Sequence, residues 1–252
     1  MRKLGVGLQL YSIRDDLRSD LPGTLRRVRD MGYPAVQLFG WAGLDAAELK
    51  PALDGLGLSV AGNHVSIGRL ESALDEEIDL ALTLGTPDVI CPALPSDRRG
   101  SIDDFRHFAS LFNSIGKRCA ERGARFHYHN HAFEFQKFDG VYAMDRLLEW
   151  TDPSLVFFEP DVYWIHIGGA DPIAYIQKCA GRVPYIHIKD YAPSRDPAYA
   201  EIGEGTLDMA AIFAASEAAG AEWYVVEQDA STRPMMESVE ISVRNLRKFG
   251  KL

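Results

Sequence analysis

The sequence predicts a single (β/α)8 TIM barrel, and three observations support this fold class. The length of 252 residues matches the typical size of such a barrel, about 250 residues. Short apolar runs alternate with amphipathic stretches from one end of the chain to the other. These runs are nearly continuous, as in parallel strands that are buried on both faces. Eight strand-then-helix units favour closure into a barrel over a doubly wound sheet.

The expected strands are residues 4–12, 34–39, 58–64, 88–92, 125–131, 155–161, 185–190 and 223–228. The expected helices are residues 21–32, 44–57, 71–85, 101–123, 141–150, 171–181, 207–220 and 237–250. Most of these helical stretches end on a glycine, which suits a left-handed C-cap. No GxGxxG follows the first strand, which disfavours a doubly wound dinucleotide fold. We expect one domain over residues 1–252.

Composition narrows the class of protein. A net charge of −9 argues against a nucleic-acid partner, which needs a basic face to neutralise phosphates. Cys91, Cys119 and Cys179 form no CxxC pair, so we expect reduced thiols. No apolar window approaches the length of a membrane span, and the N-terminal apolar stretch is too short for a signal peptide. We therefore expect a cytoplasmic protein without a membrane partner.

Four candidate metal ligands follow successive apolar runs in the second half of the chain. Glu134, Asp161, His187 and Glu227 are separated by 27, 26 and 40 residues, about one strand, helix and loop each. In a closed ring of parallel strands such residues meet above the barrel. Three carboxylates and one imidazole suit one divalent cation per chain, with Mn²⁺ expected and Mg²⁺, Co²⁺ or Zn²⁺ as alternatives.

The residues adjacent in the sequence give different support for a ligand role to Glu227, His187 and Asp161. Glu227 follows the apolar residues 224–226 and would be a costly buried charge without a partner. His187 lies between Ile186 and Ile188, so its side chain points away from theirs. Asp161 alone could equally be a helix N-cap.

The motifs GLQLYSIRDD, YHNHAFEF, DVYW, HIKD, GEGTLD and VVEQD resemble the sugar phosphate isomerase/epimerase family of xylose isomerase-like TIM barrels. The resemblance covers nearly the whole chain in the right order. It implies a divalent cation held by two Glu, one Asp and one His at strand ends, with the Glu residues as acid and base groups. It also implies a small sugar or cyclitol substrate and a possible homo-oligomer.

The first ligand departs from the family pattern. Many relatives end the fifth strand with a Glu, where this chain has His127, His129 and His131. We favour Glu134, three residues further on, because hard cations prefer oxygen. Alternatively, one of the three histidines replaces the missing carboxylate.

The expected reaction is isomerisation or epimerisation by proton abstraction next to a carbonyl, through a metal-stabilised enediolate. Glu134 and Glu227 would exchange the proton as base and acid. The second ring nitrogen of His187 would be held by Asp190 or a backbone carbonyl. The expected substrate-binding residues are His64, His129, His131, Trp164, Lys189 and Glu204, the last because its Gly-Glu-Gly setting allows backbone approach to a ligand.

Other functions share these features. A lyase or dehydratase on a keto-cyclitol or 3-keto-glycoside would form the same enolate but eliminate a group from it. An apurinic endonuclease needs a multi-metal cluster and a basic surface, which the acidic charge opposes. A non-catalytic sugar-binding barrel would keep metal binding without turnover.

Overall fold

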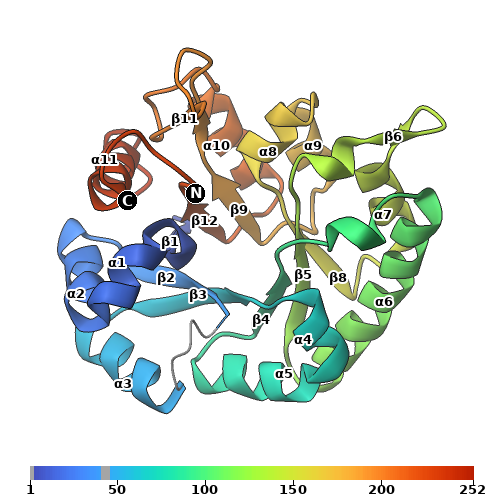
Figure 1. Ribbon diagram of the computed structural model, residues 1–252, viewed down its shortest axis with the longest axis horizontal. Coiled ribbons are helices and arrows are strands. Elements are labelled where there is room, and N and C mark those ends of the chain that lie inside the picture. Colours follow the sequence, from blue (N-terminus) through green and yellow to red (C-terminus); the bar gives the residue numbers. More distant parts are fainter. Residues whose placement is uncertain (1–2, 41–45) are drawn as a thin grey trace.

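The computed structural model describes residues 3–40 and 46–252, and it confirms the predicted barrel. Eight parallel strands form one sheet in the order β8-β5-β4-β3-β2-β1-β12-β9, surrounded by helices (Figure 1). Around the ring they are β8 (Val156–Glu159), β5 (Arg125–His129), β4 (Asp88–Cys91), β3 (Ser59–His64), β2 (Ala35–Phe39), β1 (Gly5–Gln9), β12 (Trp223–Val226) and β9 (Tyr185–Ile188).

The ring closes between β8 and β9, just beyond the end of β8. Asp161 and His187 form a parallel bridge there, and the His187 amide donates to the Pro160 carbonyl at 2.9 Å. Two of the predicted ligands therefore meet at the seam of the barrel.

The helices are α1 (Arg14–Ser19), α2 (Leu21–Met31), α3 (Ala46–Leu56), α4 (Ile67–Ser72), α5 (Leu74–Thr83), α6 (Ile102–Glu121), α7 (Ala143–Trp150), α8 (Val162–Ile167), α9 (Pro172–Lys178), α10 (Met209–Ala218) and α11 (Met235–Lys248). All eight expected helices are present. The first two residues of the expected helix 44–57 lie outside the described residues. The short helices α1 and α8 lie in segments where no helix is expected, and α4 overlaps the expected helix 71–85 only at its last two residues. One of them, α8, forms because the Asp161 carboxylate caps it by accepting from the Trp164 amide at 2.9 Å.

Two small antiparallel hairpins add to the barrel, β6 (Lys137–Phe138) with β7 (Val141–Tyr142), and β10 (Asp190–Tyr191) with β11 (Tyr199–Ala200). Short 3₁₀ turns cover Leu10–Ile13, Ser96–Arg98 and Phe133–Phe135. None of the helices in the described ranges is long and apolar enough to cross a membrane. The three cysteines are free and buried.

Most of the apolar core is one cluster of strand and helix residues, and a small second cluster unites Ala35, Ala61, Tyr185 and Val225 from four strands. At the amino ends of the strands the packing is polar. Asp88 accepts from Arg125 at 2.7 Å and from the Tyr185 hydroxyl at 2.6 Å, and lies 2.8 Å from His127 Nε2. His127 is therefore a partner of Asp88 in this polar cluster, so it is not the replacement for the first ligand.

Candidate metal centre

The carboxyl ends of the strands hold a buried cluster of acidic and basic side chains. His129, Asp161, His187 and Glu227 each offer a ligand atom, and these atoms lie within 4.8 Å of one another. All four side chains are at most 7 % exposed. The structure thus brings three of the predicted ligands together, with His129 as the fourth.

Glu134 is not part of this group. It is fully buried, and one carboxylate oxygen accepts from the Tyr128 hydroxyl while the other accepts from the His131 amide at 2.9 Å. Burial raises the pKa of Glu134 to about 8. The 3₁₀ turn at Phe133–Phe135 carries the carboxylate back toward β5. Glu134 therefore holds the backbone of His131 rather than facing the cluster.

The polar atoms of the group fit a cation. Asp161 Oδ2 lies 2.9 Å from the Lys189 ammonium, and His129 Nδ1 lies 3.3 Å from Glu159 Oε2, so both atoms are buried beside opposite charge or another candidate ligand. Two carboxylates and two imidazoles are donors that Mn²⁺, Zn²⁺ and Co²⁺ accept. Buried charges need compensation, and a cation among these donors would supply it for the carboxylates.

Lys189 supplies positive charge beside these carboxylates. Its ammonium lies 2.9 Å from Asp161, 2.7 Å from Glu227 and 2.7 Å from Asp229, and the side chain is 1 % exposed. The ammonium also lies 5.4 Å from the centre of the Trp164 ring. Lys189 is therefore a member of the cluster, whereas the sequence suggested it as a substrate-binding residue and it is not among the residues that line the cavity described below.

A deeper carboxylate, Glu159, was not identified from the sequence. It ends β8, is fully buried, and lies 2.7 Å from His64 Nε2, 3.3 Å from His129 Nδ1 and 3.1 Å from His187 Nε2. Its other oxygen accepts from the Gln37 amide at 2.6 Å. The signal was present, because Glu159 ends an apolar strand and would be a costly buried charge without partners.

His187 presents its two ring nitrogens to different partners. Nδ1 lies 3.0 Å from Glu227 Oε2, and Nε2 lies 2.7 Å from the Gln37 side-chain oxygen. The Gln9 amide donates to that same Gln37 oxygen at 2.7 Å. The expected partner, Asp190, accepts instead from the backbone amides of Gly203, Gly205, Leu207 and Tyr191. Gln37 and Glu159, rather than Asp190, orient the imidazole.

The charges shift the protonation of the cluster. Burial lowers the pKa of His187, but Glu159 and Glu227 outweigh it and raise the pKa to about 10. Burial raises the pKa of Asp161 to about 6. Burial also raises the pKa of Glu227, but Lys189 and His187 outweigh burial and hold it well below the usual range. Without a cation, His187 is therefore protonated, and His187 and Lys189 each carry a positive charge beside the carboxylates.

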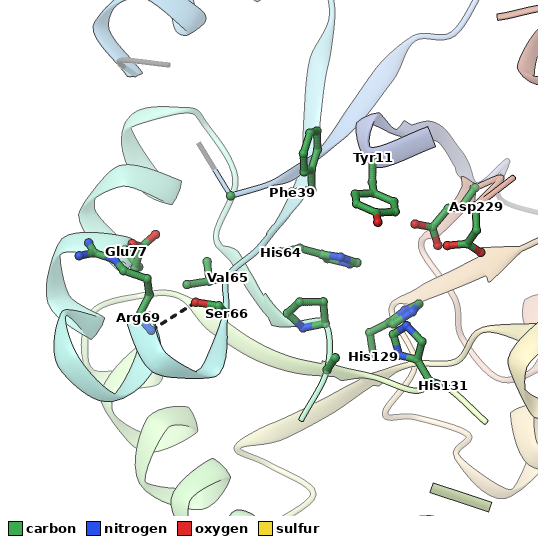
Figure 2. A pocket seen from close by; sticks show the side chains of 14 residues that line it. Tyr11, Phe39, His64, Val65, Ser66, Arg69, Glu77, His129, His131 and Asp229 are labelled. Carbon is green, nitrogen blue, oxygen red and sulfur yellow. Dashed lines mark hydrogen bonds and ion pairs between the residues drawn. The ribbon is translucent and has the colours of Figure 1, made fainter. Parts of the chain in front are cut away.

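A cavity of about 470 Å³ opens above this cluster (Figure 2). His64, His129, His131, Glu227 and Asp229 line one part of it. The other part runs between mainly apolar walls toward Ser66 and Arg69, with the following lining residues: Tyr11, Phe39, Val65, Pro92 and Ala93. Asp229, which follows β12 by three residues, is a second cavity residue that sequence reasoning missed.

The remaining predicted substrate-binding residues divide into two groups. His131 packs against Trp164, with ring centres 5.3 Å apart, and the buried Trp164 Nε1 has no hydrogen-bond partner among the described residues. Burial and Lys189 lower the pKa of His131 to about 4, so this imidazole is neutral at pH 7. Glu204, by contrast, is exposed and accepts from Asn245 at 3.2 Å, outside the cavity lining.

The chain belongs to the xylose isomerase-like TIM barrel family, whose sequence model matches residues 25–249. A sugar phosphate isomerase/epimerase from Parabacteroides distasonis has a similar structure, with 26 % identity, a TM-score of 0.85, and coverage of 98 % of this chain and 94 % of that one. An L-ribulose 3-epimerase shares the fold, with a TM-score of 0.74 at 19 % identity over 98 % of this chain and 94 % of that one.

Curated relatives are similar over part of their length. An inosose dehydratase of Geobacillus kaustophilus is 23 % identical over 69 % of this chain and 66 % of its own length. An inosose dehydratase of Clostridium tetani is 31 % identical over 35 % of this chain and 29 % of its own length. The chain thus spans less than two thirds of these relatives. Isomerases and a lyase therefore both occur among the proteins that it resembles.

Proposed function

We propose that the chain is a divalent-metal-dependent sugar isomerase or epimerase that removes a proton next to a carbonyl. The observation that carries this proposal is the buried group of His129, Asp161, His187 and Glu227 at the floor of a cavity of about 470 Å³. Such a cavity lies in the range of small-molecule sites, about 300–1,000 Å³.

Asp161, His187 and Glu227 would hold the cation, and His129 lies beside them with a ligand atom within 4.8 Å of theirs. A divalent ion bound there would stabilise the negative charge that develops on a carbonyl oxygen during deprotonation. The nearby charges favour binding of this cation. With neutral imidazoles, the cluster has four carboxylates and one ammonium, that of Lys189, so its net charge is −3; the carboxylates are Glu159, Asp161, Glu227 and Asp229. Mn²⁺ is the proposed ion, because carboxylate and imidazole donors together suit it.

The proton transfers fall to groups that line the cavity. Glu227 is ionised and lies at the cavity floor, so it serves as a base. His131 also lines the cavity and is neutral at pH 7, so its imidazole can accept a proton or a hydrogen bond from a substrate hydroxyl but is not the acid. Glu134 contributes by holding the His131 backbone. His64, Trp164 and Lys189 then orient hydroxyl groups of a small sugar or cyclitol.

A lyase acting on a keto-cyclitol or 3-keto-glycoside is the second candidate, because the curated relatives are named inosose dehydratase. Both reactions begin with the same deprotonation, so the same residues serve both. The difference is whether the carbanion is reprotonated or expels a neighbouring group.

The test is product mass after incubation of the Mn²⁺-loaded protein with a panel of ketohexoses and with inosose. An epimerase or isomerase gives a product of unchanged mass, whereas a dehydratase gives a product lighter by one water. Solvent deuterium reports the deprotonation itself, because epimerisation in D₂O introduces one deuterium at the reacting carbon. Absence of both turnover and deuterium exchange across the panel would count against the proposed activity on these substrates.

A further inference from the structure

A second group of candidate ligands is formed by His64, His129, Glu159 and His187, of which His64 and His129 also line the cavity. Their ligand atoms lie within 4.8 Å of one another, and the side chains are at most 7 % exposed. They come from four strands of the ring, β3, β5, β8 and β9, so the backbone holds them rigidly. We propose that this inner group binds its own cation, a zinc ion, separate from the ion at the cavity floor.

The distances fit tetrahedral zinc. Bonds of about 2.0–2.1 Å place the four donor atoms of such a site about 3.3 Å apart. From Glu159 Oε2 the imidazole nitrogens lie at 2.7 Å for His64, 3.3 Å for His129 and 3.1 Å for His187. Among these three contacts, only that of His64 must open, by about half an ångström.

The donor types select the metal. Three imidazoles and one carboxylate are softer than the two-carboxylate group at the cavity floor, and imidazole-rich tetrahedral sites suit Zn²⁺ rather than Mg²⁺ or Ca²⁺. His129 Nδ1 is buried and lies 3.3 Å from Glu159 Oε2, which is the donor spacing of a tetrahedral zinc site. Gln37 already holds the second oxygen of Glu159 at 2.6 Å, as a supporting residue holds a carboxylate ligand.

His187 joins the two sites. Its Nε2 faces the inner group and its Nδ1 faces Glu227, so one imidazolate can bridge two cations. Binding at Nε2 replaces the contact to the Gln37 oxygen, which keeps the hydrogen bond from Gln9 at 2.7 Å.

His129 goes to the inner ion, since its free nitrogen faces Glu159. The inner site then has four protein ligands and is closed, as structural zinc sites are. The outer site keeps Asp161, Glu227 and His187 with an open position for a substrate, as catalytic sites do. The inner zinc does not depend on the proposed reaction, because it would be present whatever the outer ion catalyses.

The two groups can be separated by mutation, since Glu159 and His64 belong only to the inner one and Asp161 and Glu227 only to the outer one. The full chain is stripped with a chelator, refilled with Zn²⁺, and analysed for metal content and for anomalous scattering at the zinc edge. We expect two zinc ions in the wild type. Glu159→Gln and His64→Asn should each lose the inner peak and keep the outer one, and Asp161→Asn should do the reverse.

Co²⁺ gives a second readout in solution, because tetrahedral Co²⁺ absorbs visible light strongly. The band should keep the contribution of the inner ion in Asp161→Asn and lose it in His64→Asn, which removes a side chain at the edge of the cavity and preserves the buried Glu159. A wild type that holds a single ion between Asp161 and Glu227, with unchanged metal content in Glu159→Gln and His64→Asn, would overturn the inner site. Loss of catalysis with both zinc peaks present would refute only the proposed activity.

Discussion

Replacing Glu134 by Gln separates a supporting role from a ligand role. Burial raises the pKa of this carboxyl from 4.5 to about 8, so the folded protein favours its neutral form. A raised carboxyl pKa contributes stability that is fully present below the unfolded pKa and is lost as the pH rises through the folded value. A difference of 3.5 pKa units at about 1.4 kcal/mol each predicts a loss of about 5 kcal/mol between pH 4.5 and pH 8.

Reversible urea unfolding of the metal-free proteins at pH 5, 6.5 and 8.5 measures this loss. The amide does not titrate, so the free energy of unfolding of the wild type should fall relative to that of Glu134→Gln by several kcal/mol over this range. The lost acceptor of the Tyr128 hydroxyl or of the His131 amide adds a constant offset, which leaves the slope unchanged. A difference that is independent of pH, or loss of metal binding in Glu134→Gln, would refute the supporting role.

Three further predictions concern the cluster and its surroundings. Glu227→Gln should lower kcat by about 100-fold or more, which is the usual effect of losing an acid or base. The control Glu204→Gln changes a residue outside the cavity lining and should leave kcat unchanged. Equal effects of the two substitutions would contradict the role of Glu227. The pKa of His187 is raised to about 10, and an imidazole must be neutral to bind a metal, so Mn²⁺ binding should release a proton. The affinity should therefore increase about tenfold per pH unit between pH 7 and 9, which calorimetry in two buffers would measure. A Kd that does not change with pH would exclude His187 as a ligand. Gly205→Ala should destabilise the protein by about 1–3 kcal/mol, since the new methyl would lie 2.3 Å from the Asp190 carboxylate; an unchanged Tm would show that the loop adjusts freely.

The barrel was predictable because each strand is an apolar run followed by an amphipathic helix. His187 and Glu227 were predictable for the same reason, since a charged or polar side chain within an apolar strand end needs a partner. Asp161 serves as both a helix cap and a candidate ligand, because one carboxylate oxygen caps α8 while the other faces the cluster, 2.9 Å from the Lys189 ammonium.

Other parts depend on contacts between distant segments. Gln37 and Glu159 are 122 residues apart in the sequence, and their side chains meet only because the ring of strands closes. The contact between them could therefore not be predicted from the sequence neighbours of either residue. Glu134 was expected at the metal because it follows a strand end by a few residues. The 3₁₀ turn at Phe133–Phe135 directs it to Tyr128 instead, and spacing alone carries no sign of that turn.

Crystals of the protein soaked in Mn²⁺ and measured at the manganese edge test the metal centre most directly. We predict a peak within ligand distance of Asp161, His187 and Glu227, at the floor of the cavity. No peak is expected within ligand distance of Glu134, whose oxygens are taken by Tyr128 and His131. A manganese peak at Glu134, or none among Asp161, His187 and Glu227 at saturating Mn²⁺, would contradict the proposed centre.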